Sequence, residues 1–309
     1  MPTLTRPAAL LALALITPAL AACASPAPGA STTISTSTAS STSSSSAATA
    51  SAVPAGALSL VVVGDSIPLA DPCPTCQHFP DTFATAVAKR SGHPVVVTNR
   101  ARGDAAGVAQ IAEQVTSDNE LRSQLARADV VVLSVGFNNA LPDLENQPPG
   151  GLPAGCDKVA PGVSDAVIGH IVATTPACNV KTAAAFAPLY DSILDAMAGQ
   201  RGGKPTTFLV LNAYDGNISN TDIKAALDPK TFAATEKVIV SAYDAWNQML
   251  CGRVTAHHMT CVDVYHSFNG SHGDQPAFPL TVDGAHPNQK GNDVIADLLT
   301  RAYGSASTS

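Results

Sequence analysis

Short apolar runs alternate along this chain with longer segments in which apolar residues recur at helical spacing. Each short run is aliphatic, rich in β-branched residues and bounded by polar or turn residues, which predicts a strand. We predict strands at residues 57–63, 95–98, 129–135, 207–211 and 260–265, and helices near 81–91, over 108–128, and around 186–197, 238–250 and 294–302. The last helix is expected to stop at Gly304, because glycine favours a helix C-terminus. This alternation is typical of a parallel sheet with helices on both faces.

The first 22 residues have the pattern of a secretory signal. Arg6 precedes an apolar stretch over residues 8–20 that is too short to span a bilayer as a helix. The stretch ends in Leu20-Ala21-Ala22-Cys23, which resembles a bacterial lipoprotein box. The resemblance implies cleavage before Cys23 and lipid attachment to its thiol, and two or more acyl chains would hold the protein on the outer face of the cell membrane. The alternative is an ordinary export signal followed by a chance cysteine.

Composition divides the remainder of the chain. Residues 23–56 are mostly Ser, Thr, Ala and Pro without apolar periodicity, which predicts a disordered tether. Residues 57–304 then form one α/β domain, and residues 305–309 are a short tail. Within the domain, residues 140–177 are rich in Pro and Gly and are interpreted as an inserted loop, a kind of segment that is often functional or disordered.

Charge and cysteine content narrow the function classes. The net charge of −7 disfavours a nucleic-acid partner, because no basic stripe is present to neutralise phosphates. Apart from Cys23, six cysteines remain, an even number that suggests disulfides in an exported chain. Sequence alone does not choose among the fifteen possible pairings. We favour the local set Cys73–Cys76, Cys156–Cys178 and Cys251–Cys261. A redox role for Cys73-Pro74-Thr75-Cys76 is the alternative, but the motif lies in a Pro-rich loop and does not open a helix.

Polar residues with useful chemistry follow the predicted strands. Ser66 comes directly after the first strand, and a serine hydroxyl needs an adjacent base to become a nucleophile. Asp283 and His286 lie three residues apart after the last strand, so the carboxylate can accept the Nδ1 proton of the imidazole. Nε2 would then be free to take the Ser66 proton. Taken alone, Asp-x-x-His could equally be a helix-capping element with an exposed histidine.

Three donors could stabilise an oxyanion beside such a serine. They are the backbone N–H of Ser66, the N–H of Gly103 after the second strand, and the side-chain amide of Asn138 after the third. Individually, Gly103 could be an ordinary turn residue and Asn138 a strand-end cap. Because ligands bind at the carboxyl ends of the strands in an open parallel sheet, the four segments together predict one hydrolytic site.

These four segments, in this order, resemble the blocks of the SGNH (GDSL-type) hydrolase family. Gly64-Asp65-Ser66-Ile67 resembles the first block, Gly103 the second, Gly136-Phe137-Asn138-Asn139 the third and Asp283-Gly284-Ala285-His286 the fourth, with Ile67 where Leu is usual and Asn139 where Asp is usual. The resemblance implies a three-layer α/β/α fold of flavodoxin type around a five-stranded parallel sheet. It also implies that Ser66 is the nucleophile, His286 the acid/base, Asp283 its orienting group, and Ser66, Gly103 and Asn138 the oxyanion hole.

The resulting hypothesis is an exported, lipid-anchored serine esterase that needs no cofactor or metal and acts on a small-molecule ester, an acylated lipid or an acylated sugar. An acyltransferase acting on cell-envelope glycan or lipid, and a non-catalytic lipoprotein that binds lipid or glycan, remain as alternatives. An α/β-hydrolase is disfavoured because no G-x-S-x-G motif is present. A metal site is also disfavoured, because the spacing of its candidate ligands fits no standard zinc pattern; these are His257, His258, His266 and His272, with Cys261 nearby.

Overall fold

The computed structural model describes residues 53–141, 147–156, 175–219 and 221–306. The signal segment, Cys23 and nearly all of the proposed tether lie outside these residues, as do 142–146 and 157–174 of the proposed insertion and the last three residues of the tail. The predictions made for them therefore stay predictions. Within the described part of the chain, no helix is both long and apolar enough to cross a membrane.

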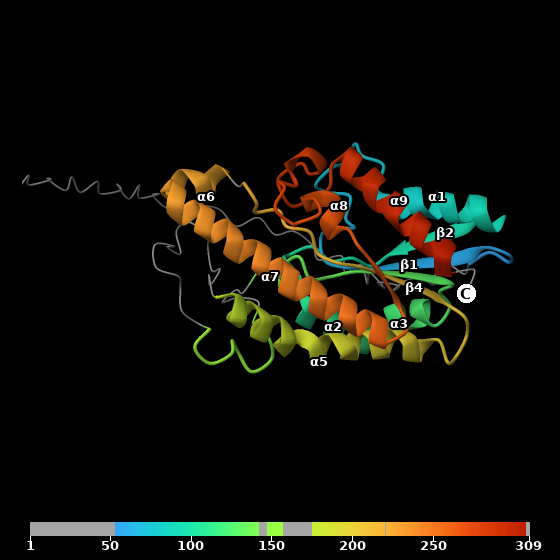
Figure 1. Ribbon diagram of the computed structural model, residues 1–309. Coiled ribbons are helices and arrows are strands. Elements are labelled where there is room, and N and C mark those ends of the chain that lie inside the picture. Colours follow the sequence, from blue (N-terminus) through green and yellow to red (C-terminus); the bar gives the residue numbers. More distant parts are fainter. Residues whose placement is uncertain (1–52, 142–146, 157–174, 220, 307–309) are drawn as a thin grey trace, which may run out of the picture. The chain divides into compact units, whose positions relative to one another are not determined.

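The centre of the domain is a five-stranded, all-parallel sheet with the strand order β2-β1-β3-β4-β5. Figure 1 shows the strands side by side between two sets of helices. The strands are β1 (Leu58–Gly64), β2 (Val95–Asn99), β3 (Val130–Ser134), β4 (Thr207–Leu211) and β5 (Thr260–Val262). Every residue of β3 is buried, which explains why it has no alternation of apolar and polar residues.

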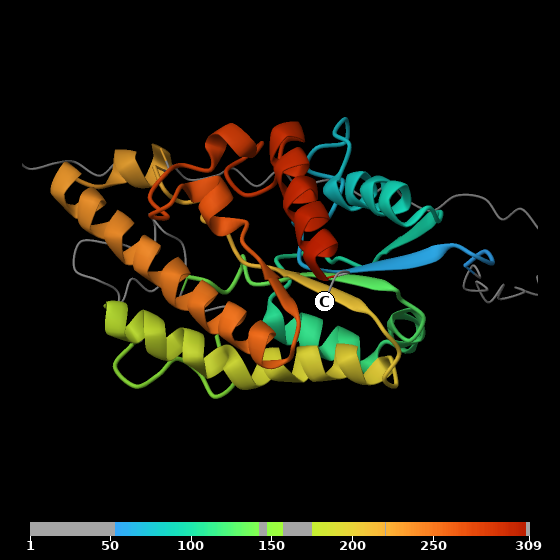
Figure 2. The same ribbon diagram turned by 45° about the vertical axis from the view of Figure 1, so that its right-hand side comes forward.

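Helices cover both faces of the sheet, as the two views of the ribbon show (Figures 1 and 2). Val61 and Val63 of β1 belong to one apolar core, and Leu60 and Val62 to the other, because successive side chains of a strand point to opposite faces. The first core is closed by α2 (Val108–Ser117), α3 (Asn119–Leu125), α5 (Pro176–Gln200) and α7 (Pro229–Ala256), and the second by α1 (Phe79–Ser91) and α9 (Gln289–Ala306). The predicted three-layer α/β/α fold class is thereby confirmed.

Three of the predicted boundaries are wrong. The single helix expected over 108–128 is divided at Asp118 into α2 and α3, because the Asp118 carboxylate accepts the N–H groups of Glu120 and Leu121 and caps a new helix. The strand expected over 260–265 ends at Val262. The side-chain oxygen of Asn212 accepts the N–H groups of Val264 and Tyr265 instead, at the start of the short helix α8 (Tyr265–Asn269).

The third difference concerns Gly304, which lies inside α9 and does not end it. Its lack of a side chain serves a close approach: a Cβ at this position would lie 2.7 Å from Nη1 of Arg90. Arg90, in the last turn of α1, donates a hydrogen bond to the Gly304 carbonyl at 3.2 Å. The glycine therefore marks the contact between α1 and α9. The sequence pattern also gave no indication of two further short helices, α6 (Thr221–Ala226) and the 3₁₀ helix η1 (Phe278–Leu280).

Each of the six described cysteines is paired with a partner close in sequence. The disulfides are Cys73–Cys76, Cys156–Cys178 and Cys251–Cys261, the local set favoured from the sequence. Cys73–Cys76 lies in the loop between β1 and α1 and does not open a helix, since α1 begins at Phe79. Such a position is consistent with a structural cross-link.

The loop after β4 buries the carboxyl group of Asp215, a residue with no exposed surface. One carboxylate oxygen accepts the N–H of Asn217 at 2.7 Å, but the other has no hydrogen-bond partner within the described residues. Burial raises the pKa of Asp215 to about 7, although the backbone and side chain of Asn217 act to lower it. The nearby charge of Glu236 raises it further.

We predict that Asp215→Asn makes the folded state more stable in alkaline solution. Because the folded state holds the Asp215 proton more tightly than the unfolded chain, the unfolding free energy falls as pH rises from near 3.8 to about 7. The amide cannot ionise, so the variant should gain roughly 1–4 kcal/mol over wild type at pH 8 and little at pH 4. Urea denaturation at both values measures the difference. The same substitution at the exposed Asp297 is the control, and an unchanged pH dependence in Asp215→Asn would contradict the prediction.

Candidate active site

The candidate nucleophile, Ser66, follows the buried strand β1 at the carboxyl edge of the sheet. The last residue of β1, Gly64, has no room for a side chain because β3 passes close by. A Cβ on Gly64 would lie 2.2 Å from the carbonyl oxygen of Ser134. The N–H of Leu69 donates to the Ser66 carbonyl at 3.0 Å and closes a tight turn. The sheet and this turn together fix the position of the half-buried serine. In the strand order observed here, β1 and β3 flank the point at which the chain direction across the sheet reverses, where open α/β folds bind ligands.

The neighbouring Asp65 ties the ends of β1 and β3 together. Its side chain is 1% exposed, and its two oxygens accept the N–H groups of Ile67 at 3.1 Å and Gly136 at 3.3 Å. Burial raises the pKa of Asp65 to about 7, while the N–H groups of Ile67, Gly136 and Phe137 act to lower it. Asp65 therefore lies among backbone N–H groups and away from solvent, a position that suits a structural role.

Asp283 and His286 lie on the loop that leads into α9, and the structure brings both to Ser66. The carboxylate of Asp283 lies 2.7 Å from Nδ1 of His286, and it also accepts the N–H of His286 at 2.7 Å and that of Ala285 at 2.9 Å. Burial acts to raise the pKa of Asp283, but these hydrogen bonds from the backbone and ring of His286 outweigh it and hold the pKa below its usual value. Asp283 therefore remains a carboxylate beside the imidazole.

On its other side, the imidazole contacts the serine. Nε2 of His286 lies 3.0 Å from Oγ of Ser66, a distance at which the hydroxyl can donate its proton to the ring. The loop that carries His286 is also restrained by the segment after β4, because the hydroxyl of Tyr214 donates to the carbonyl of Ala285. The distances required of a serine–histidine–aspartate arrangement are thus present.

The two remaining donors lie on adjacent segments of the same edge. The N–H of Arg102 bonds to the carbonyl of Gly64 at 2.8 Å, which places Gly103 next to the turn that carries Ser66. The side-chain amide of Asn138 donates to the carbonyl of Ala106 at 3.0 Å, which fixes its orientation and leaves a second amide proton. The N–H groups of Ser66 and Gly103 have no hydrogen-bond partner in the described part of the chain.

Asn139, which stands where the SGNH pattern has Asp, is a structural anchor. Its side chain is 3% exposed, and its oxygen accepts the N–H of Val108 at 2.8 Å, at the first residue of α2. A hydrogen bond from the Asn139 N–H to the Gly136 carbonyl closes the turn around Asn138. The neutral amide oxygen of Asn139 thus caps the start of α2, a role that does not require the charge of an aspartate.

Two of the histidines considered as metal ligands lie against carboxylates. Nε2 of His257 lies 3.0 Å from Asp191, and Nδ1 of His266 lies 2.7 Å from Asp263. Cys261 is in a disulfide, and the described residues contain no group of three or more side chains that could hold a metal ion. Asp263 and His266 nevertheless repeat the Asp-x-x-His geometry of the active site, in a position where no serine hydroxyl of the described residues lies against the ring.

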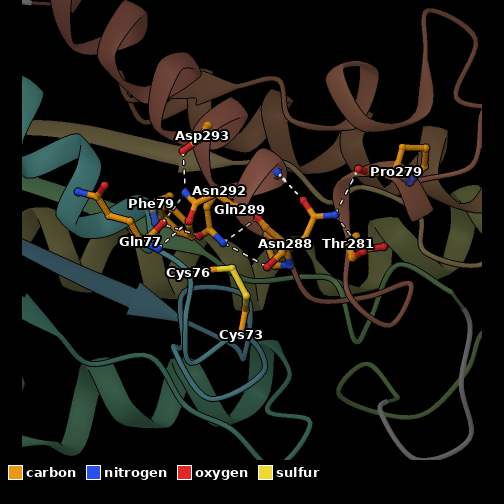
Figure 3. Close-up of a disulfide and its surroundings, with 12 residues drawn as sticks. Cys73, Cys76, Gln77, Phe79, Pro279, Thr281, Asn288, Gln289, Asn292 and Asp293 are labelled. Carbon is orange, nitrogen blue, oxygen red and sulfur yellow. Dashed lines mark hydrogen bonds between the residues drawn. A yellow bond between two sulfur atoms is a disulfide. The ribbon is translucent and has the colours of Figure 1, made fainter.

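The loop between Ser66 and α1 is closed by a series of tight turns. After the turn at Ser66, the N–H of Cys73 donates to the Ala70 carbonyl at 3.1 Å, and the N–H of Cys76 donates to the Cys73 carbonyl at 2.9 Å. The Cys73–Cys76 disulfide covers the last of these turns, next to the start of α9 (Figure 3). Ser66 is therefore connected to the start of α1 by a loop that these turns and the disulfide hold together.

A buried amide, that of Asn292, joins the start of α1 to the histidine loop. Oδ1 of Asn292 accepts the N–H of Phe79 at 2.9 Å, and its Nδ2 donates to the carbonyl of Pro287, directly after His286, at 3.1 Å. Figure 3 shows Gln289 beside it, paired with the backbone of Gln77. Asn292 is 2% exposed, so both bonds are shielded from water. Asn292 thus links the start of α1, at the end of the loop from Ser66, to the residue that follows His286.

Sequence reasoning missed this bridge, although a signal was present. Asn292 occupies a core position of the last helix, in line with the buried Ile295 and Leu299. A polar side chain at such a position must find hydrogen-bond partners, so an asparagine there indicates a specific contact. The partner, at the start of α1, could not have been identified from the sequence.

Comparison with known proteins supports the fold assignment. No family model matches the sequence, and no curated protein matches it. Among solved structures, a lipase from a goat rumen metagenome is 14% identical, with 79% of this chain and 97% of that chain covered and a TM-score of 0.56. A GDSL-like lipase from Parabacteroides merdae is 15% identical, with 80% and 95% covered and a TM-score of 0.50. The chain therefore has the fold of GDSL-type (SGNH) hydrolases, which the sequence blocks had implied.

We predict that loss of the Asn292 bridge slows the reaction of Ser66 without unfolding the protein. A displacement of about 1 Å between reacting groups can cost on the order of 10²-fold in rate, so Asn292→Ala and Asn292→Asp should slow fluorophosphonate labelling of Ser66 by about 10- to 100-fold. Labelling rates and thermal denaturation are measured together. Asp191→Asn is the control, because it breaks an ion pair with Arg253 between α5 and α7. Normal labelling in a folded Asn292 variant would contradict the prediction.

Proposed function

We propose that this chain is a serine esterase of the SGNH type that cleaves carboxylic esters through an acyl-enzyme on Ser66. The observation that carries the proposal is the contact of His286 Nε2 with Ser66 Oγ at 3.0 Å, together with that of His286 Nδ1 with Asp283 at 2.7 Å. The likeness in fold to a lipase and a GDSL-like lipase supports the same class of reaction.

In the proposed first step, the Ser66 oxygen attacks the ester carbonyl and its proton passes to Nε2 of His286. The carbonyl oxygen becomes an oxyanion that accepts hydrogen bonds from the N–H groups of Ser66 and Gly103 and from the Asn138 amide. The imidazolium, stabilised by the Asp283 carboxylate, then gives its proton to the alcohol oxygen as the carbon–oxygen bond breaks. The acyl group stays on Ser66.

Water completes the cycle. His286 takes a proton from a water molecule whose oxygen attacks the acyl carbon, and the same proton returns to Ser66 as the acid leaves. The net reaction consumes one ester and one water and yields one acid and one alcohol. Every group that this scheme uses comes from the protein or the substrate.

Export and a lipid anchor on Cys23 belong to the same proposal. The support within the described residues is the pairing of all six cysteines there into disulfides, which persist in oxidising compartments. The anchor would place the proposed esterase on the outer face of the cell membrane. Mass spectrometry of the native protein from its membrane fraction tests the anchor directly, since acyl chains on Cys23 add a defined mass.

We predict that Ser66→Ala abolishes hydrolysis of a short-chain aryl ester and that His286→Ala lowers kcat by about 10³-fold or more, because no base remains to activate the serine. Both variants should unfold at the wild-type temperature. His266→Ala is the matched control, since it removes the histidine of the Asp263–His266 pair and should leave kcat unchanged. Full turnover in Ser66→Ala would reject the proposed function.

A further inference from the structure

The loop that carries Asp283 and His286 is a small antiparallel hairpin. Thr281 and Pro287 form its β-bridge, and the N–H of Val282 donates to the carbonyl of His286 at 2.8 Å. Residues opposite each other in an antiparallel pair project their side chains to the same face. Thr281 and Pro287 therefore share one face, and Val282 and His286 share the other.

Burial agrees with this assignment. Thr281 is 6% exposed and Pro287 is buried, whereas Val282 is 47% exposed and His286 is partly exposed. Directly opposed residues have Cβ atoms about 4.5–5.5 Å apart, so the side chains of Val282 and His286 leave the hairpin next to each other. An apolar side chain thus faces solvent on the same side as the group that would move the proton.

A second exposed apolar side chain borders the same hairpin. Phe278, in η1, is 40% exposed, and its ring lies 3.2 Å from the position that a Cβ on Gly284 would occupy. Gly284 has φ 89° and lies between Asp283 and His286, so the ring packs against the tip of the hairpin. We call Phe278 and Val282 together the apolar edge.

The apolar edge is unusual for this molecule. Only three large apolar side chains are strongly exposed among the described residues, and the third, Val180, lies on α5 in the layer that covers the other face of the sheet. Single exposed apolar residues need no explanation, but here one lies on the hairpin and the other packs against its tip, beside the proposed acid/base, which favours a contact with a ligand. Neither side chain offers a hydrogen-bond donor or acceptor, so the matching part of that ligand is apolar.

The proposed reaction decides which part of the ester lies there. When the acyl-enzyme forms, His286 gives its proton to the departing alcohol oxygen, so the alcohol portion must lie against Nε2 of His286. From the esterase function proposed above, we infer that the apolar edge contacts the alcohol portion of the ester. The site then favours esters of alkyl or lipid alcohols over esters of sugars, whose hydroxyl groups would lose hydrogen bonds to water without replacement.

The test compares acetates that differ only in the alcohol: ethyl acetate, hexyl acetate and 6-O-acetylglucose. The wild-type enzyme should have a kcat/KM for hexyl acetate about tenfold or more above that for ethyl acetate, since each buried methylene contributes up to about 0.8 kcal/mol. Val282→Ser and Phe278→Ser should lower this hexyl-to-ethyl ratio by about threefold or more. Val180→Ser makes the same change at an exposed valine away from the hairpin and should leave the ratio intact.

Two results would overturn the inference: a hexyl-to-ethyl ratio that Val282→Ser leaves unchanged, or a wild-type preference for 6-O-acetylglucose over hexyl acetate. The decision rests on Val282, because its side chain is exposed while the Phe278 ring also supports the hairpin. Ser66→Ala tests the proposed esterase function separately from the preference for the alcohol portion. If that variant is inactive and the ratio does not respond, only the alcohol preference fails.

Discussion

The hydrogen bonds accepted by the buried carboxyl group of Asp65 are the interactions on which the rest of the site depends. Two neighbouring parallel strands end here, and their first turns leave backbone N–H groups that would be costly to bury without partners. Asp65 accepts those of Ile67 and Gly136 at once, so the turn that carries Ser66 and the turn that carries Asn138 cannot move independently. Burial raises the pKa of Asp65 to about 7, so the cost of burying the charge outweighs the hydrogen bonds that favour the carboxylate.

A site divided between the two ends of a chain needs a second link. Ser66 and His286 are 220 residues apart, and the sheet alone positions only the serine. The hairpin that carries His286 leads into α9, which packs on the same face of the sheet as α1. The buried side chain of Asn292, in α9, bonds both to Phe79 at the start of α1 and to Pro287 in the hairpin. Tyr214 holds the hairpin from the β4 side. The histidine is thus restrained from two directions, although it lies on a loop.

Most of the fold follows from local patterns in the sequence. The five apolar runs and their order predicted the parallel sheet, because period and position suffice for that inference. The polar residues after the predicted strands suggested Ser66, Asp283 and His286, which the structure brings together. The wrong boundaries had causes that periodicity does not contain: Asp118 restarts a helix by capping it, Asn212 ends β5 early, and Gly304 accommodates Arg90. The Asn292 bridge and the apolar edge depend on tertiary placement, so residues alone could suggest that Asn292 has a partner but not which one.

The local pairing of the cysteines has a consequence for the integrity of the molecule. Cys156 and Cys178 enclose the stretch of chain between them, so a cut anywhere within that stretch leaves both fragments covalently joined. The same holds for a cut between Cys251 and Cys261, which lie in the last part of α7 and in β5. A nicked molecule would therefore keep its full mass under oxidising conditions and separate into two pieces only after a thiol reagent is added.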